Sequence, residues 1–192
     1  MAATSSTDVL PLGSAAPDFD LPDIGGTRVS NSDFAGRPLL VMFICNHCPY
    51  VKHINRGLVA FGREYLDRGL EIVAINSNDA DAYPEDSPKK MQEVAAQLEY
   101  PFPYLFDETQ EVAQAYGAAC TPEFFLFDAG HRLAYHGQFD DSRPQSDKKV
   151  TGHDLRAAAD AVLAGKKPRT PQVPSIGCSL KWRPGNEPKP AP

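Results

Sequence analysis

Two cysteines spaced three residues apart are the side chains of this sequence best suited to chemistry. Cys45 and Cys48 form a C-x-x-C pair after the apolar run of residues 39–44. That run has the length of a buried strand, and Pro49 suits the first turn of a helix because its missing N–H would have no partner there. A helix N-terminus stabilises a thiolate beside it at neutral pH. The pattern predicts a redox pair at a strand-to-helix turn, with a metal clip and inert thiols as the alternatives.

Composition and charge limit the cellular location and the binding partners that we expect. The chain has 192 residues, of which 42% are apolar, and a formal net charge of −6. These values predict one domain with its own core, and the scattered basic residues argue against a nucleic-acid partner. Residues 1–14 have neither a basic head nor a long apolar run, so we expect no secretory signal, no membrane anchor and a cytoplasmic location. In that compartment four cysteines favour catalysis or metal binding over a disulfide scaffold.

A βαβ unit is predicted around the cysteine pair. After Pro49, apolar residues recur every three or four positions on one face, which indicates an amphipathic helix ending near Gly69. Residues 70–77 are the next strand. The other predicted elements are an N-terminal β-hairpin over residues 18–30, helices over 89–98, 108–116 and 154–163, a short strand over 104–106, and a second β-hairpin of strands 123–127 and 132–136.

Three segments are predicted: a flexible N-terminus over residues 1–15, a folded domain over 16–165, and a Pro-rich tail over 166–192. The tail holds seven prolines and is expected to form no packed helix or sheet of its own. Trp182 and Cys178 lie in its middle, which suggests that the tail docks on the body.

Three motifs in order along the chain carry a family resemblance. They are an Ala-Pro-Asp-Phe start at residues 16–19, the Cys-Asn-His-Cys-Pro turn at 45–49, and Thr121-Pro122 directly before a strand. With them the chain resembles the AhpC/TSA, peroxiredoxin-like branch of the thioredoxin superfamily, near thiol–disulfide oxidoreductases of the TlpA and ResA type. The resemblance implies a thioredoxin-like α/β fold: a central mixed sheet flanked by helices, an N-terminal β-hairpin and an extended C-terminal tail.

The resemblance also implies roles for the site residues. A cis bond before Pro122 would face the cysteines and leave backbone groups near Thr121 free to hold an extended substrate segment. Cys45 would be the exposed, attacking thiolate and Cys48 the partner that closes the disulfide. His47 would stabilise the reduced form and make the disulfide more oxidising. The substrate would be a protein or small thiol or disulfide, with a separate electron donor and no dissociable cofactor or metal.

Peroxide reduction, an antioxidant activity, is the second hypothesis, and a non-catalytic binding or adaptor module is the third. Peroxiredoxins carry Pro-x-x-x-Thr/Ser-x-x-Cys, yet Val41 and Cys45 stand seven and three residues before Cys48. The arginine expected ahead of the later strand is also missing, because that place reads Thr121-Pro122-Glu123. Without a hydroxyl and a guanidinium there is little to polarise an O–O bond.

The remaining cysteines and histidines leave alternatives open. Cys120 and Cys178 are candidate additional redox thiols, although Cys120 also fits a small buried hydrophobe and Cys178 could simply pack. Structural zinc would need two further ligands from Cys120, Cys178, His47 and His53, with no spacing that brings them together. We expect His53 on the surface, no role for the other histidines, and an ordered polar turn over residues 138–144.

Overall fold

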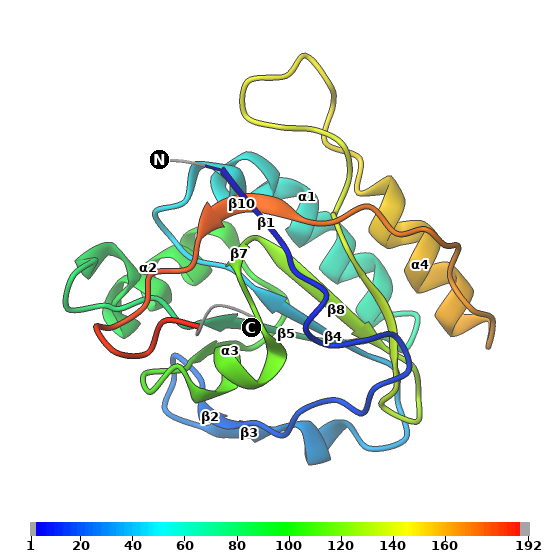
Figure 1. Ribbon diagram of the computed structural model, residues 1–192, viewed down its shortest axis with the longest axis horizontal. Helices are drawn as coiled ribbons and strands as arrows, with labels where there is room; N and C mark the ends of the chain where they lie inside the picture. The colour runs from blue at the N-terminus through cyan, green and yellow to red at the C-terminus, as the bar shows by residue number, and fades with distance from the viewer. Residues whose placement is uncertain (1–2, 189–192) are drawn as a thin grey trace.

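A five-stranded mixed sheet forms the centre of the fold in the computed structural model, which describes residues 3–188 (Figure 1). Its strand order is β6 (Tyr104–Phe106), β5 (Glu71–Asn76), β4 (Leu39–Phe43), β8 (Glu123–Phe127) and β9 (Leu133–Gly137). The central strand β4 runs parallel to β5 and antiparallel to β8. All five residues of β4 are buried, as expected for a strand covered on both faces.

Alternating side chains of β4 divide the core into two layers. Leu40 and Met42 pack with helices α1 (Pro49–Leu66), α2 (Pro88–Leu98) and α4 (His153–Leu163). Val41 and Phe43 pack on the opposite face with α3 (Glu111–Tyr116) and with the hairpin of β2 (Asp20–Pro22) and β3 (Arg28–Ser30). The sheet therefore lies between helical layers, with the predicted N-terminal hairpin closing one side.

Most element boundaries agree with the sequence, and the differences have local causes. Helix α3 begins at Glu111 rather than at 108, because Asp107 and Gln110 form a turn in which Gln110 adopts a φ of 66°. The β8–β9 turn is held by Asp128, whose Oδ1 accepts the N–H groups of Gly130 and Arg132 at 2.9 Å each. Short 3-10 helices η1 (Asn31–Phe34) and η2 (Pro84–Asp86) complete the fold. Within residues 3–188, no helix is both long and apolar enough to cross a bilayer.

A second, three-stranded sheet joins the two ends of the chain. Strand β1 (Ala3–Ser5) pairs with β10 (Ile176–Ser179), and β10 pairs with β7 (Cys120–Thr121), all antiparallel. Figure 1 shows β1 and β10 side by side in front of the main sheet, near the start of α1. Two expectations were therefore wrong: the N-terminal segment packs from Ala3 onward, and the Pro-rich tail contains a strand.

The described part of the tail, residues 166–188, contacts the body of the protein. Trp182 packs against the core layer that contains α3, and the backbone N–H of Lys181 donates to Asn78 Oδ1 at 2.8 Å. Residues 1–2 and 189–192 of the two predicted terminal segments lie outside the described residues.

Gly177→Ala is expected to destabilise the protein by about 1–3 kcal/mol, the usual cost of overpacking. A Cβ at this position would lie 2.0 Å from the carbonyl oxygen of Thr121, so β10 would have to move away from β7. Thermal unfolding followed by circular dichroism measures the loss. Gly130→Ala is the matched control, since its Cβ would meet only Asp128 Oδ1, at 3.3 Å. An equal loss in both variants would contradict the prediction.

Candidate active site

The C-x-x-C pair lies where β4 ends and α1 begins, as predicted. Cys48 is the N-cap residue of α1, with an extended backbone, and Pro49 occupies the first helical position. All four cysteines of the chain are free thiols. The expected exposure of Cys45 was wrong, because Cys45 is 2% exposed and Cys48 is 0% exposed.

Thr121 faces both cysteines. The Thr121–Pro122 peptide bond is cis, as the resemblance implied. Thr121 Oγ1 lies 3.3 Å from Cys45 Sγ, and Cys48 Sγ lies 3.2 Å from the Thr121 carbonyl oxygen, to which the Cys48 thiol donates in its protonated form. One residue therefore holds both sulfur atoms through its side chain and its backbone.

The backbone beside Pro122 is not free, which corrects the expectation of an open edge for an extended substrate. Cys178 of β10 is the partner of Thr121 in the strand register, and Ser179 is the partner of Cys120. This pairing could not be recognised from local pattern, because β7 spans two residues and β10 four, too few to show a strand pattern.

The pKa values of the two cysteines move in opposite directions, down for Cys48 and up for Cys45. The neighbouring Cys45 thiol, the Cys178 thiol and the backbone N–H of Val51 lower the pKa of Cys48 to about 5, against the effect of burial. The hydrogen bond to Cys48, burial and the nearby Asp86 carboxylate raise the pKa of Cys45. The helix N-terminus thus acts on the second cysteine, which caps it.

Asp86 is a buried acid that organises the turn and that sequence reasoning missed. Its Oδ1 accepts the backbone N–H of Asn46 at 2.8 Å, and its Oδ2 accepts Asn78 Nδ2 at 2.8 Å. Burial alone would raise the pKa of Asp86, but hydrogen bonds from His47, Asn78 and Asn46 bring it below its usual value. A signal was available: Asp86 lies in the loop after β5, and the carboxyl ends of the parallel strands β4 and β5 share one edge.

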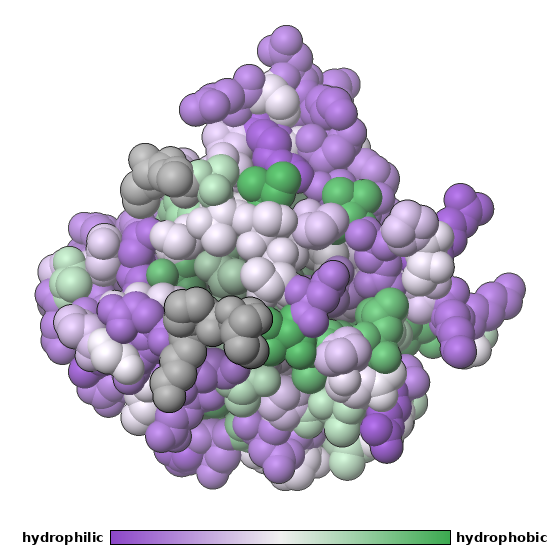
Figure 2. Space-filling model, viewed as in Figure 1, coloured by the Kyte–Doolittle hydropathy of each residue, from purple (hydrophilic) through white to green (hydrophobic). Residues whose placement is uncertain are grey.

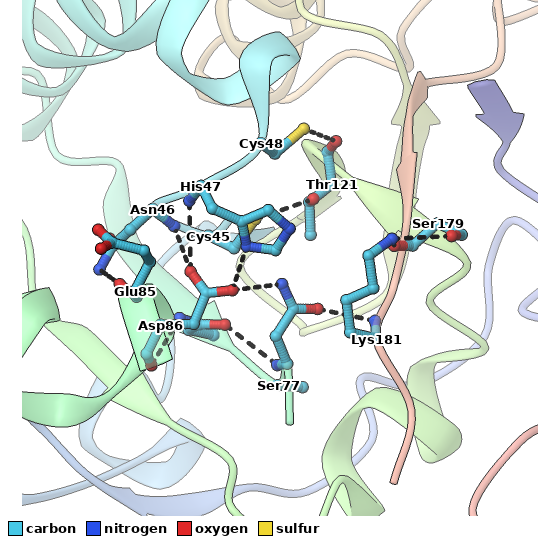
Figure 3. Close-up of polar contacts among 12 residues, drawn as sticks. Cys45, Asn46, His47, Cys48, Ser77, Glu85, Asp86, Thr121, Ser179 and Lys181 are labelled. Atoms are coloured by element: carbon cyan, nitrogen blue, oxygen red, sulfur yellow. Dashed lines mark hydrogen bonds and ion pairs between the residues drawn. The ribbon is translucent and has the colours of Figure 1, made fainter. Parts of the chain in front are cut away.

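His47 lies between this carboxylate and the cysteines. Its Nδ1 is 2.5 Å from Asp86 Oδ2, and its ring stacks on Tyr83 with centroids 5.1 Å apart. Because an ionised carboxylate only accepts, Nδ1 carries the proton of that contact. The buried Nε2 has no hydrogen-bond partner among the described residues. Figure 3 shows His47, Cys45, Cys48 and Thr121 gathered together, with Asp86 beside His47.

The same residues form a cluster with metal-ligand chemistry. Single ligand atoms of Cys45, His47 and Asp86 lie within 4.8 Å of one another, and thiolate, imidazole and carboxylate are all zinc ligands. Both Asp86 oxygens already accept hydrogen bonds, from Asn46 and Asn78. In this structure Asp86 therefore holds neighbouring segments together by hydrogen bonds. The zinc ligands considered from the sequence differ, since Cys120, Cys178 and His53 are not part of this cluster.

Cys120 is fully buried behind the pair, and burial raises the pKa of its thiol. Its neighbour Glu123 is also fully buried and accepts the N–H groups of Ala119 and Cys120. His136, for which the sequence indicated no role, lies 2.7 Å from Glu123 Oε1 through its Nε2. These contacts fix the turn that carries Thr121 and Pro122.

The predicted polar turn over residues 138–144 is confirmed. Asp140 accepts hydrogen bonds from Ser142, Thr151 and Gly152, and Arg143 donates to Gln138 Oε1. His53, expected on the surface, is half-buried and lies 3.1 Å from Ser142 Oγ through Nε2.

A family model agrees with this geometry. The model described as AhpC/TSA family matches residues 12–136. The chain belongs to the AhpC/TSA family. Solved thioredoxin-fold oxidoreductases less than 25% identical to it share its architecture, which confirms the predicted fold.

Two curated relatives and one solved structure illustrate the range within the family. The thiol–disulfide oxidoreductase ResA of Bacillus cereus is 24% identical over 157 residues, covering 77% of this chain and 83% of its own. The peroxiredoxin Bcp of Escherichia coli is 29% identical over 135 residues, covering 66% and 78%. An uncharacterised conserved protein from Geobacillus kaustophilus is 52% identical, with a TM-score of 0.93 over 96% of this chain and 98% of that one.

Ultraviolet absorption of the reduced protein is expected to show a thiolate that forms with a midpoint near pH 5, the pKa of Cys48. Because that pKa is lowered, the thiolate is present above the midpoint and is lost as the pH falls through it. Cys48→Ser should remove the transition, and Cys45→Ala should move it to higher pH by removing the donor thiol. Cys120→Ser, the control, should leave it in place; a transition that follows Cys45 instead would show that the thiolate is on the first cysteine.

Proposed function

We propose that the protein is a thiol–disulfide oxidoreductase whose Cys45 and Cys48 cycle between dithiol and disulfide. The observation that carries the proposal is the state of Cys48: a sulfur at the N-cap of an 18-residue helix, with its pKa lowered to about 5 and a second thiol donating to it. A thiolate is the nucleophile in disulfide exchange, and a neighbouring thiol completes the reaction. The substrate is a disulfide, and a separate thiol donor regenerates the pair.

Exchange begins at Cys48 in this proposal, which reverses the order expected from the resemblance. The Cys48 thiolate attacks one sulfur of a substrate disulfide, a mixed disulfide forms, and the leaving thiolate takes the proton of Cys45. The Cys45 thiolate then attacks the Cys48 sulfur, which releases the second substrate thiol and closes the Cys45–Cys48 bond. Loss of the Cys48 charge in the first step removes one cause of the raised pKa of Cys45, so the second nucleophile is activated when it is needed.

Thr121 and Pro122 position the reacting sulfurs in this proposal. Thr121 contacts both cysteines, and Pro122 lines a hollow together with Tyr50, His53 and Arg143. The hollow adjoins the start of α1, and we assign it to substrate approach. A cytoplasmic location stays a prediction from the sequence.

Peroxide reduction is the second candidate, because the relative Bcp is named a peroxiredoxin and Cys48 is the low-pKa thiol. The residues around Cys48 predict that peroxide reduction is slow. Residue 123 is a buried glutamate paired with His136, so no guanidinium occupies that place, and the hydroxyl expected three residues before Cys48 is replaced by the Cys45 thiol.

Turnover of oxidised glutathione, with dithiothreitol as the donor, tests the main proposal. Cys48→Ser is expected to abolish turnover, and Cys120→Ser to leave it within about twofold, because burial raises the pKa of Cys120 and keeps it a thiol at neutral pH. The same preparation treated with hydrogen peroxide measures the second candidate. Wild-type protein that turns over neither substrate would favour the non-catalytic binding module.

His47→Gln is expected to make the active-site disulfide less oxidising, with a reduction potential about 10–30 mV more negative. The imidazole N–H compensates the Asp86 carboxylate, and without it that charge disfavours the thiolate of the reduced pair. A glutathione redox titration measures the potential. His53→Gln is the matched control, since its imidazole contacts Ser142 instead. An unchanged potential in His47→Gln would rule out a tuning role.

A further inference from the structure

Strand β10 places a third thiol at the cysteine pair. Cys178 is the register partner of Thr121, the residue whose side chain contacts Cys45 and whose carbonyl oxygen accepts from Cys48. Partners on neighbouring antiparallel strands project to the same face of the sheet. The side chain of Cys178 therefore lies on the face that carries the pair.

Burial and hydrogen bonding agree with this placement. Cys178 is 2% exposed and belongs to the same buried cluster as Cys45 and Cys48. Its thiol is one of the groups that hydrogen-bond to Cys48, and Cys48 in turn is one of the causes that raise the pKa of Cys178, after burial. Cys120, by contrast, has its Sγ 3.8 Å from the Pro122 carbonyl oxygen.

The strand is held at this position along its length. Gly177 allows the close approach, because a side chain there would meet Thr121. Ser175 exchanges hydrogen bonds with Ser6 on one side of the strand, and Leu180 donates its N–H to the Ala119 carbonyl oxygen on the other, at 3.0 Å. These contacts hold Cys178 beside Thr121.

We propose that Cys178 is a third redox residue, which attacks the mixed disulfide on Cys48 and forms an intramolecular Cys48–Cys178 bond. The inference rests on the proposed exchange function. Cys178 loses its proton, its sulfur bonds to the Cys48 sulfur, and the bond between Cys48 and the substrate sulfur breaks; the departing substrate thiolate takes the proton. The thiol donor then reduces the Cys48–Cys178 bond. Cys48 thus takes part in either of two alternative disulfides, Cys45–Cys48 or Cys48–Cys178.

Reaction with oxidised glutathione in a Cys45→Ser background tests the proposal. This variant keeps Cys48 and Cys178 but lacks the first partner. It is expected to release a second glutathione per protein and to give a Cys48–Cys178 disulfide, mapped by mass spectrometry after proteolysis. Cys45→Ser with Cys178→Ser should stop at the mixed disulfide on Cys48, and Cys45→Ser with Cys120→Ser should behave like Cys45→Ser alone.

The outcomes separate this inference from the function on which it rests. A mixed disulfide that persists in Cys45→Ser, as in the double variant lacking Cys178, would overturn the role of Cys178 and leave the exchange function standing. No mixed disulfide in that double variant would overturn the first step of exchange itself. Circular dichroism and thermal unfolding of each variant establish that it is folded before the reaction.

Discussion

The contacts of Thr121 are the constraint on which the site depends. Its hydroxyl meets Cys45, its carbonyl oxygen accepts from Cys48, and its backbone pairs with Cys178. The register of the main sheet makes this meeting unavoidable: Phe43 of β4 is opposite Glu123 of β8, so the residues just beyond each strand come together. A shift of that register would separate the thiols from the turn that holds them.

Buried acidic groups around the site need hydrogen-bond partners, and this is the second constraint on the region. Asp86, Glu123 and Cys48 are all buried out of contact with solvent, where a polar group without a hydrogen-bond partner is costly. Backbone N–H groups, histidine rings and neighbouring thiols provide the compensation, and no lysine or arginine contacts the three groups among the described hydrogen bonds and ion pairs. The face of the molecule that carries β1 and β10 has apolar patches within a mostly polar surface (Figure 2).

The features that depend on residues close together in the chain could be predicted from the sequence. The apolar run before Cys45 and the helical spacing after Pro49 were enough to place the pair at a strand-to-helix turn, and the resemblance supplied the cis bond at Pro122. The rest depends on contacts between distant segments. Asp86 is 39 positions from His47, and β10 reaches Thr121 only through the complete fold. The burial of Cys45 follows from those contacts, which is why its expected exposure was wrong.

The pairing of β1 with β10 has a consequence for how the protein is made. During synthesis the cysteine pair and the turn at Pro122 leave the ribosome well before Ile176–Ser179, so the main sheet can form while the thiols are still uncovered. Strand β10 can pair with β1 and cover Cys48 only after residues 176–179 have been synthesised. A nascent or truncated chain would therefore carry accessible thiols without the third cysteine, and its surroundings would decide which disulfide it forms first.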